Sequence, residues 1–105
     1  MMNDEEKYNL INQKYSNVEK VSDNLNIVFD NDPNLEFKIS TRKNKKYMVK
    51  GEFSRNKWIH FGQMGYQDYT YHNNDIRRLN FKNRNIRWSN SKVDSPAFLS
   101  YYILW

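Results

Sequence analysis

The first apolar residues of the chain recur at helical spacing. Steps of three or four residues place them on one side of a helix, and Asn3 or Asp4 is expected to cap its start. The segment VSDN is expected to end this helix near residue 22. The predicted stripe consists of Tyr8, Ile11, Tyr15 and Val18.

Alternating apolar and polar residues predict strands after this helix. Leu25, Ile27 and Phe29 share one side of residues 25–29, and the turn sequence DNDPN leads into LEFKIST at 35–41. A β-hairpin is expected to pair residues 46–53 with 57–62. Its register would set Val49 opposite Phe61, its core face would hold Tyr47, Val49, Ile59 and Phe61, and its other face would hold Lys46, Met48, Lys50, Trp58 and His60.

Two more helices are predicted in the second half. Asn73 or Asn74 is expected to cap the first, over DIRRLNFKNRNIR, with Ser95 and Pro96 at the N-cap and first position of the second. The narrow apolar stripe of the first helix is expected to face the core. It consists of Ile76, Leu79 and Ile86.

The last segment, SPAFLSYYILW, is apolar on almost every side. A helix over residues 96–105 would be about 15 Å long, about half the thickness of a bilayer core, so it cannot span a membrane. We expect it to complete the core; an interface with a partner is the alternative.

These elements predict an α+β fold in one domain, residues 1–105. We expect a small antiparallel sheet of about four strands with two or three helices packed against it. Residues 1–22 would form an acidic N-terminal helix or leader, and residues 25–105 a basic body.

Charge divides the chain in two. Residues 1–36 carry eight acids and three lysines, for a net charge of −5, while residues 37–105 carry fourteen lysines and arginines and four acids, for +10. A basic body attracts polyanions, although a solvated basic surface is the alternative. The chain has no cysteine, signal sequence or long apolar stretch, so we expect no disulfide, secretion or membrane anchor.

Basic residues interleaved with aromatic ones are the main candidate for a binding site. Lysine and arginine neutralise phosphates, and aromatic rings such as Trp58 or Phe81 stack on bases. Alternatively, Arg77 and Arg84 cover Phe81 with their aliphatic stems. The candidate nucleic-acid-binding residues are Lys43, Lys45, Lys46, Lys50, Lys57, Arg77, Arg78, Lys82, Arg84 and Arg87.

Other polar groups match no catalytic pattern. His60, Asp68 and His72 lack the spacing of a zinc or hydrolytic site, so we predict no catalytic residue, metal or cofactor, and keep a metal-dependent nuclease as a remote alternative. Asp68 is expected to cap the loop or pair with an arginine. Gly62 and Gly65 are expected to form turns at positive φ.

Residues 46–105 contain the segments KYMVKG, WIHFG, GYQDYTYH, an arginine-rich helix and SPAFLSYYILW. This order resembles a family of small basic uncharacterised proteins of nucleocytoplasmic large DNA viruses. The resemblance implies a virion or intracellular location in the host cytoplasm or viral factory, and no assigned biochemistry. The matching positions are His60, Phe61, Gly62, Gly65, Tyr66, Asp68, Tyr69, Thr70, His72, Arg77, Arg78, Arg84, Ser95, Pro96, Leu104 and Trp105.

The sequence therefore predicts a non-enzymatic viral protein that binds DNA or RNA mainly through phosphate contacts, without strong sequence preference. The alternative is a minor capsid or scaffold protein without nucleic-acid binding, which contacts a viral structural protein or forms a homo-oligomer. The acidic leader is also expected to compete with polyanions for the basic body.

Overall fold

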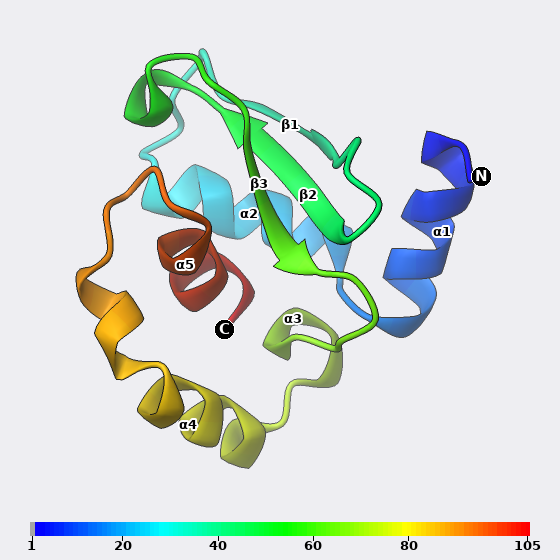
Figure 1. Cartoon of the computed structure of the whole chain (residues 1–105), viewed down its shortest axis with the longest axis vertical. Helices are drawn as coiled ribbons and strands as arrows, with labels where there is room; N and C mark the ends of the chain where they lie inside the picture. The colour runs from blue at the N-terminus through cyan, green and yellow to red at the C-terminus, as the bar shows by residue number, and fades with distance from the viewer. Residues whose placement is uncertain (1) are drawn as a thin grey trace.

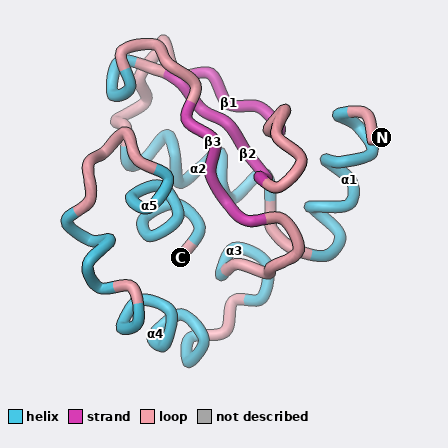
Figure 2. Tube along the Cα trace, in the orientation of Figure 1, coloured by secondary structure: helices cyan, strands magenta, loops and turns pink. Residues whose placement is uncertain are grey.

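A computed structural model describes residues 2–105 of the chain (Figure 1). It is an α+β fold in which α2 lies behind a small sheet and the other helices lie beside and below it, as the tube view also shows (Figure 2). The helices and strands are α1 (Asp4–Lys14), α2 (Val18–Val28), β1 (Glu36–Ile39), β2 (Lys45–Lys50), β3 (Ile59–Gln63), α3 (Tyr69–His72), α4 (Asp75–Arg84) and α5 (Pro96–Leu99). Two 3-10 turns, Glu52–Ser54 and Ile86–Asn90, and a π-helical turn, Ser100–Leu104, complete the fold.

The N-terminal segment contains two helices where one was predicted. Asn3 caps α1, and the side chain of Asn17 caps α2 by accepting from the backbone N–H of Lys20. The chain turns between them at a buried serine, Ser16. The segment VSDN therefore lies inside α2 instead of ending a helix, and the predicted boundary between leader and body falls within that helix.

The strand predicted at residues 25–29 is wrong because α2 continues to Val28. Residues two apart on a helix point about 200° away from each other. Leu25 is consequently fully buried, whereas the side chain of Ile27 is 76% exposed. An alternating pattern over only five residues did not separate a strand from the end of a helix.

The sheet has three antiparallel strands in the order β1-β2-β3 among residues 2–105, one fewer than predicted. Tyr47 lies opposite Phe61, and Val49 opposite Ile59, so the predicted hairpin register is wrong by two residues. The cause is a longer connection, which contains the turn Glu52–Ser54. A shift of two preserves the faces of a strand, and Tyr47, Val49 and Phe61 are buried as predicted.

The core lies where α2, the sheet and the C-terminal helix meet. We use the name C-terminal helix for residues 96–104, that is α5 and the π-helical turn that continues it. α2 passes behind the sheet, and the C-terminal helix lies beside β3 (Figure 1). The most buried apolar residues are Ile11, Val18, Val21, Leu25, Tyr47, Val49, Phe61, Leu99, Ile103 and Leu104.

The C-terminal helix begins as predicted, with Ser95 as N-cap and Pro96 in the first turn. Leu99, Ile103 and Leu104 are buried in the core. Trp105 is only half-buried, so it borders the core instead of lying inside it. No helix within residues 2–105 is both long enough and apolar enough to cross a membrane.

α4 packs against the rest of the protein with a different side from the one predicted. Ile76, Leu79 and Ile86 are 72%, 60% and 58% exposed, so the predicted core stripe is wrong. Phe81 and Lys82 are the partly buried residues of this helix. The reason is that α4 lies at the periphery (Figure 1) and contacts its neighbours along one edge.

The burial difference along α2 gives a direct test of the fold. We expect Leu25→Ala to lower the free energy of unfolding by about 2–5 kcal/mol, since it opens a cavity in the core. Ile27→Ala should change it by about 0.5 kcal/mol or less, because that side chain is largely in solvent. Urea unfolding measures both; equal losses would instead fit the strand predicted from the sequence.

Candidate nucleic-acid interface

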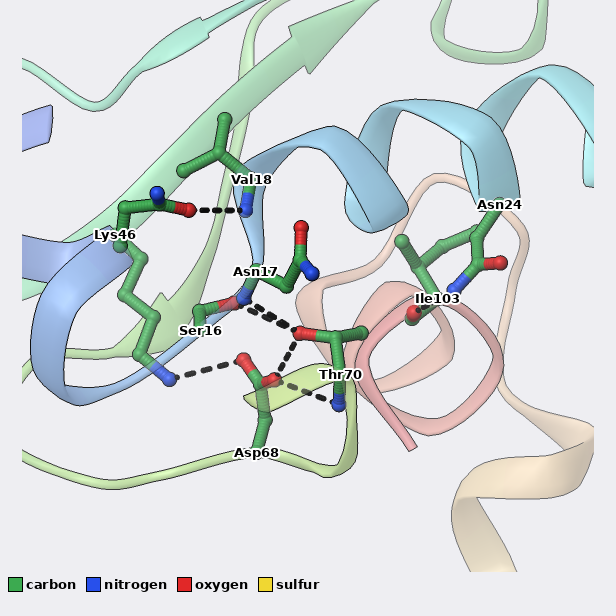
Figure 3. Close-up of polar contacts among 9 residues, drawn as sticks. Ser16, Asn17, Val18, Asn24, Lys46, Asp68, Thr70 and Ile103 are labelled. Atoms are coloured by element: carbon green, nitrogen blue, oxygen red, sulfur yellow. Dashed lines mark hydrogen bonds and ion pairs between the residues drawn. The ribbon is translucent and has the colours of Figure 1, made fainter. Parts of the chain in front are cut away.

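A buried ion pair lies beneath the candidate interface. The Nζ of Lys46, on β2, is 3.1 Å from Oδ2 of Asp68, and both side chains are 2% exposed (Figure 3). Burial lowers the pKa of Lys46 below its ordinary value, while the charge and hydrogen bond of Asp68 act to raise it. Such a pair is maintained only when the remaining polar atoms also find partners.

Thr70 supplies those partners. Both its backbone N–H and its hydroxyl donate to Oδ1 of Asp68. The Thr70 hydroxyl oxygen in turn accepts from the backbone N–H of Asn17 at 3.0 Å and lies 3.1 Å from the Ser16 hydroxyl (Figure 3). The network joins β2, the loop after β3 and the connection between α1 and α2.

The same loop determines where α4 begins. Asp68 caps the short helix α3, so the predicted capping role is confirmed, although its charged partner is a lysine and not an arginine. Asn73 then reverses the chain at φ 52°, and the Asn74 side chain caps α4 by accepting from two backbone N–H groups. α4 therefore starts at Asp75, shortly after the buried aspartate.

Aromatic stacking holds α4 against the C-terminal helix. The rings of Phe81 and Trp105 are parallel, with centroids 4.2 Å apart, and Trp88 meets Phe81 edge-on at 5.8 Å. The Nε of Arg78 donates to the main-chain oxygen of Trp105 at 2.7 Å. Trp105 thus attaches a helix that buries none of its own residues completely.

A groove of about 510 Å³ lies between α4, the loop after β3 and the C-terminal helix. We call it the arginine–aromatic groove. Arg77 and Arg84 lie seven residues apart on α4, which places them two turns apart on one side of the helix. Its other wall-forming side chains include Gln63, Tyr66, Gln67, Asn80, Trp88 and Trp105.

The groove offers donors and apolar surface together. Nη1 of Arg77 donates to Oε1 of Gln67 at 3.0 Å, which orients one guanidinium, and Arg84 is exposed at the other end of the same face. Tyr66 also lines the groove, and its side chain is 68% exposed. Guanidinium groups beside a free aromatic ring suit a phosphate joined to a base.

The structure corrects the predicted role of Lys46. It was placed among the phosphate contacts, but its ammonium is buried against Asp68. The sequence reading set the residue on an open face of the hairpin. That face is covered, since Met48 beside it is also buried and Gly62 opposite approaches Leu104.

The other candidate lysines are distributed over several elements. Lys43 is exposed in the turn between β1 and β2, and Lys45 begins β2. Lys50, at the other end of β2, lies 3.8 Å from Glu36 and 4.9 Å from the ring centre of Trp58. Lys57 is exposed in the connection to β3. Figure 1 shows that connection at the end of the sheet away from α4.

Three of the predicted basic residues lie on or beside α4 but outside the groove. Arg78 packs on Tyr69, with its guanidinium carbon 4.8 Å from the ring centre. Lys82 lies 4.5 Å from the ring centre of Tyr101, and burial, followed by the charge of Arg78, lowers its pKa. Arg87 is exposed in the turn after α4. The ten residues therefore do not form one patch, and the groove joins Arg77 with Arg84.

The two histidines and Asp68 each have a separate structural contact. Nδ1 of His60 lies 2.7 Å from the hydroxyl of Ser40, and Nδ1 of His72 accepts from the backbone N–H of Asn74 at 2.9 Å. Within residues 2–105, no group of three His, Asp or Glu side chains is arranged to hold a metal ion. The imidazole of His72 uses Nδ1 as an acceptor, which requires an unprotonated Nδ1.

The sequence reading missed the groove residues outside the basic set. Tyr66, Trp88 and Trp105 come from three segments, and only packing brings them to α4. A partial signal was present: the alternative in which Arg77 and Arg84 cover Phe81 already set these residues side by side on the predicted helix, and all three line the groove. The predicted positive φ is confirmed at both glycines, 81° at Gly62 and 90° at Gly65, but only Gly65 lies in a turn, because Gly62 lies within β3.

The Lys46–Asp68 pair predicts a large effect from a single substitution. Lys46→Met leaves a buried carboxylate without its cation, so the free energy of unfolding should fall by about 3–5 kcal/mol. Lys46→Met with Asp68→Asn should recover much of this loss, because Asn can still accept from the Thr70 N–H. Lys50→Met is the control, since its exposed pair with Glu36 should contribute less than about 1 kcal/mol; denaturant titration compares the three.

The histidines predict a loss of stability in mild acid. Burial, followed by nearby cations, lowers the pKa of His60 and of His72 in the folded state. Below about pH 6.5 the unfolded chain therefore binds protons that the folded chain does not, and the free energy of unfolding falls as the pH decreases. In His60→Asn with His72→Asn this slope between about pH 7 and pH 5 should be smaller; an unchanged slope would assign it to other groups.

Comparisons with known proteins add one partial match. A family model described as a family of unknown function (DUF5754) matches residues 35–85, which extend from just before β1 to just after α4. No curated protein and no solved structure matches the chain. The matched segment includes the buried pair, α3 and both arginines of the groove, so it is similar to a family whose model assigns no activity.

Proposed function

We propose that this protein binds single-stranded nucleic acid without strong sequence preference, in the arginine–aromatic groove, and catalyses no reaction. The observation that carries the proposal is the placement of Arg77 and Arg84 on one side of α4, facing a groove with aromatic walls. Sequence-independent binders of single strands combine cations for the backbone with rings on which bases stack.

The dimensions and lining of the groove favour an unpaired nucleotide over a duplex. A concave site of about 510 Å³ admits a single residue of a strand, whereas a double helix presents a broad convex surface. Tyr66 offers a largely exposed ring. Gln63, Gln67 and Asn80 supply amide groups that can meet base edges of any sequence.

The biological setting that we propose follows from the sequence resemblance alone. The motifs of residues 46–105 support a protein of a large DNA virus, located in the virion or in the cytoplasm of the infected cell. Nucleic acid that is transiently unpaired during replication or packaging would then be the ligand. The net charge of +10 over residues 37–105 is consistent with an electrostatic contribution to such binding.

Two double variants that have the same net charge as each other test the proposal. Arg77→Ala with Arg84→Ala removes two cations from the groove, and Lys43→Ala with Lys57→Ala removes two exposed cations elsewhere. We expect the first to weaken binding of a labelled oligonucleotide by about tenfold or more, and to reduce the slope of log K against log salt by about 1.4 for a single strand. The control should have a much smaller effect, and a duplex of the same length should bind more weakly.

Fluorescence anisotropy at several salt concentrations measures affinity and slope together. Equal losses in the two double variants would assign binding to general charge and contradict a site in the groove. Binding that ignores ionic strength would contradict phosphate contacts altogether.

A second candidate function has its own observation. Ile76, Leu79 and Ile86 are largely exposed on or directly after α4, and exposed apolar residues that gather on one element are common at protein interfaces. This favours a structural interaction protein, such as a minor capsid or scaffold component. A defined complex with a viral structural protein, formed by a chain with no affinity for nucleic acid, would support this candidate against the first.

A further inference from the structure

The sheet has an outer face, which points away from α2 and the core. Successive residues of a strand point to opposite faces, and Tyr47 of β2 is buried in the core. Lys46, Met48 and Lys50, on the same strand, therefore belong to the other face. Figure 1 shows α2 behind the sheet, and no helix of the described chain crosses in front of it. We call this surface the outer sheet face.

Strand pairing extends the outer sheet face over β1 and β3. Met48 lies opposite Lys38 of β1 on one side and opposite His60 of β3 on the other. Trp58 precedes His60 by two positions, so it lies next to it on the same face. The Nζ atoms of Lys38 and Lys50 are 5.7 Å and 4.9 Å from the ring centre of Trp58. Two ammonium groups thus lie around one indole.

Both ammonium groups remain available to a ligand. An aromatic ring attracts a cation but does not neutralise its charge. Lys38 is exposed and forms no ion pair with the rest of the described chain. Nζ of Lys50 is 3.8 Å from Oε2 of Glu36, too far for a hydrogen bond, and the Glu36 side chain is 52% exposed. Because such a pair contributes less than about 1 kcal/mol, a phosphate oxygen can replace the carboxylate.

The outer sheet face is continuous with the arginine–aromatic groove. Lys46 and Gly62 belong to this face, and both line the groove. The stem of Lys46 lies over Gly62, where Cβ and Cδ of the lysine are 3.3 Å from the position that a Cβ of the glycine would take. Trp58 is about 13 Å from Gly62 along the chain, at about 3.3 Å a residue. A strand that leaves the groove at Gly62 therefore meets the two lysines next.

The charge of the outer sheet face is mainly positive. Glu36 is the single acid of the three described strands. Burial, followed by the charges of Arg42, Lys7 and Lys45, lowers the pKa of His60, which indicates that these cations lie close to its imidazole. A face with this balance of charge is complementary to a polyanion.

We propose that the single strand bound in the arginine–aromatic groove continues across the outer sheet face, where Lys38 and Lys50 hold a phosphate of its backbone beside Trp58. This inference rests on the proposed function and adds a second phosphate site to it. The occupant is the same strand, because the two surfaces adjoin and both present cations next to aromatic rings. The complete site then covers several nucleotides, as in other proteins that bind single strands along a basic surface.

Oligonucleotides of two lengths separate the second site from the groove. We use single strands of about 4 and about 12 nucleotides, of which only the longer reaches across the sheet. Lys38→Gln with Lys50→Gln should weaken binding of the longer strand by about fivefold or more, reduce its salt slope by about 1.4 and leave the shorter strand unaffected. The matched control, Lys14→Gln with Lys20→Gln, removes the same charge from exposed positions of α1 and α2.

A gain of affinity tests the same site from the opposite direction. Glu36→Gln removes the carboxylate that competes for Lys50, so the longer strand should bind about twofold to fivefold more tightly. The shorter strand should bind as before. Glu5→Gln makes the same charge change at an exposed position of α1 and should have a smaller effect. Unchanged thermal unfolding would show that each variant folds.

The outcomes distinguish this inference from the proposed function. A loss confined to the longer strand in the Lys38 and Lys50 double variant supports the second site. Equal affinities of the wild-type protein for the two lengths, or equal losses in the double variant and its control, overturn the second site and leave the groove in place. Absence of binding at both lengths overturns the groove and, with it, the extension across the sheet.

Discussion

The buried ion pair between Lys46 and Asp68 is the contact on which the rest of the structure depends. It joins the central strand to the loop after β3, and through Thr70 it reaches the connection between α1 and α2. Two charges without water require full hydrogen bonding, and the short helix α3 supplies part of it because Asp68 is its N-cap. The Asp68 carboxylate therefore forms the ion pair with Lys46, caps α3 and fixes where the chain leaves the sheet.

The position at which the chain leaves the sheet determines where α4 lies in the fold. The helix starts shortly after α3 and lies at the edge of the fold, attached by Phe81 against Trp105 and by Arg78 to the main chain of Trp105. With no fully buried residue of its own, α4 leaves most of its surface exposed. One side presents Arg77 and Arg84 to the groove, and another presents Leu79 beside cations.

Two lysines show why net charge alone describes this surface poorly. Lys46 is buried against Asp68, and the Nζ of Lys7 donates to the backbone oxygens of Ser40 and Arg42, each at 2.8 Å. Burial lowers the pKa of both. Both act as structural donors that join elements, so the charge available to a polyanion is smaller and more localised than the formal value.

The sequence by itself determined the features that depend on neighbouring residues. The caps at Asn74 and Ser95, Pro96 in the first turn and the positive φ of the two glycines were predictable, because each satisfies local backbone groups or a local φ value. Only the tertiary structure decided that residues 25–28 are helical, that Ile76 and Leu79 face solvent and that Lys46 is buried. Those outcomes depend on partners far away in sequence, such as Asp68 for Lys46 and Trp105 for Phe81. Periodicity shows that a helix has an apolar side, but packing against those partners selects the side that is buried.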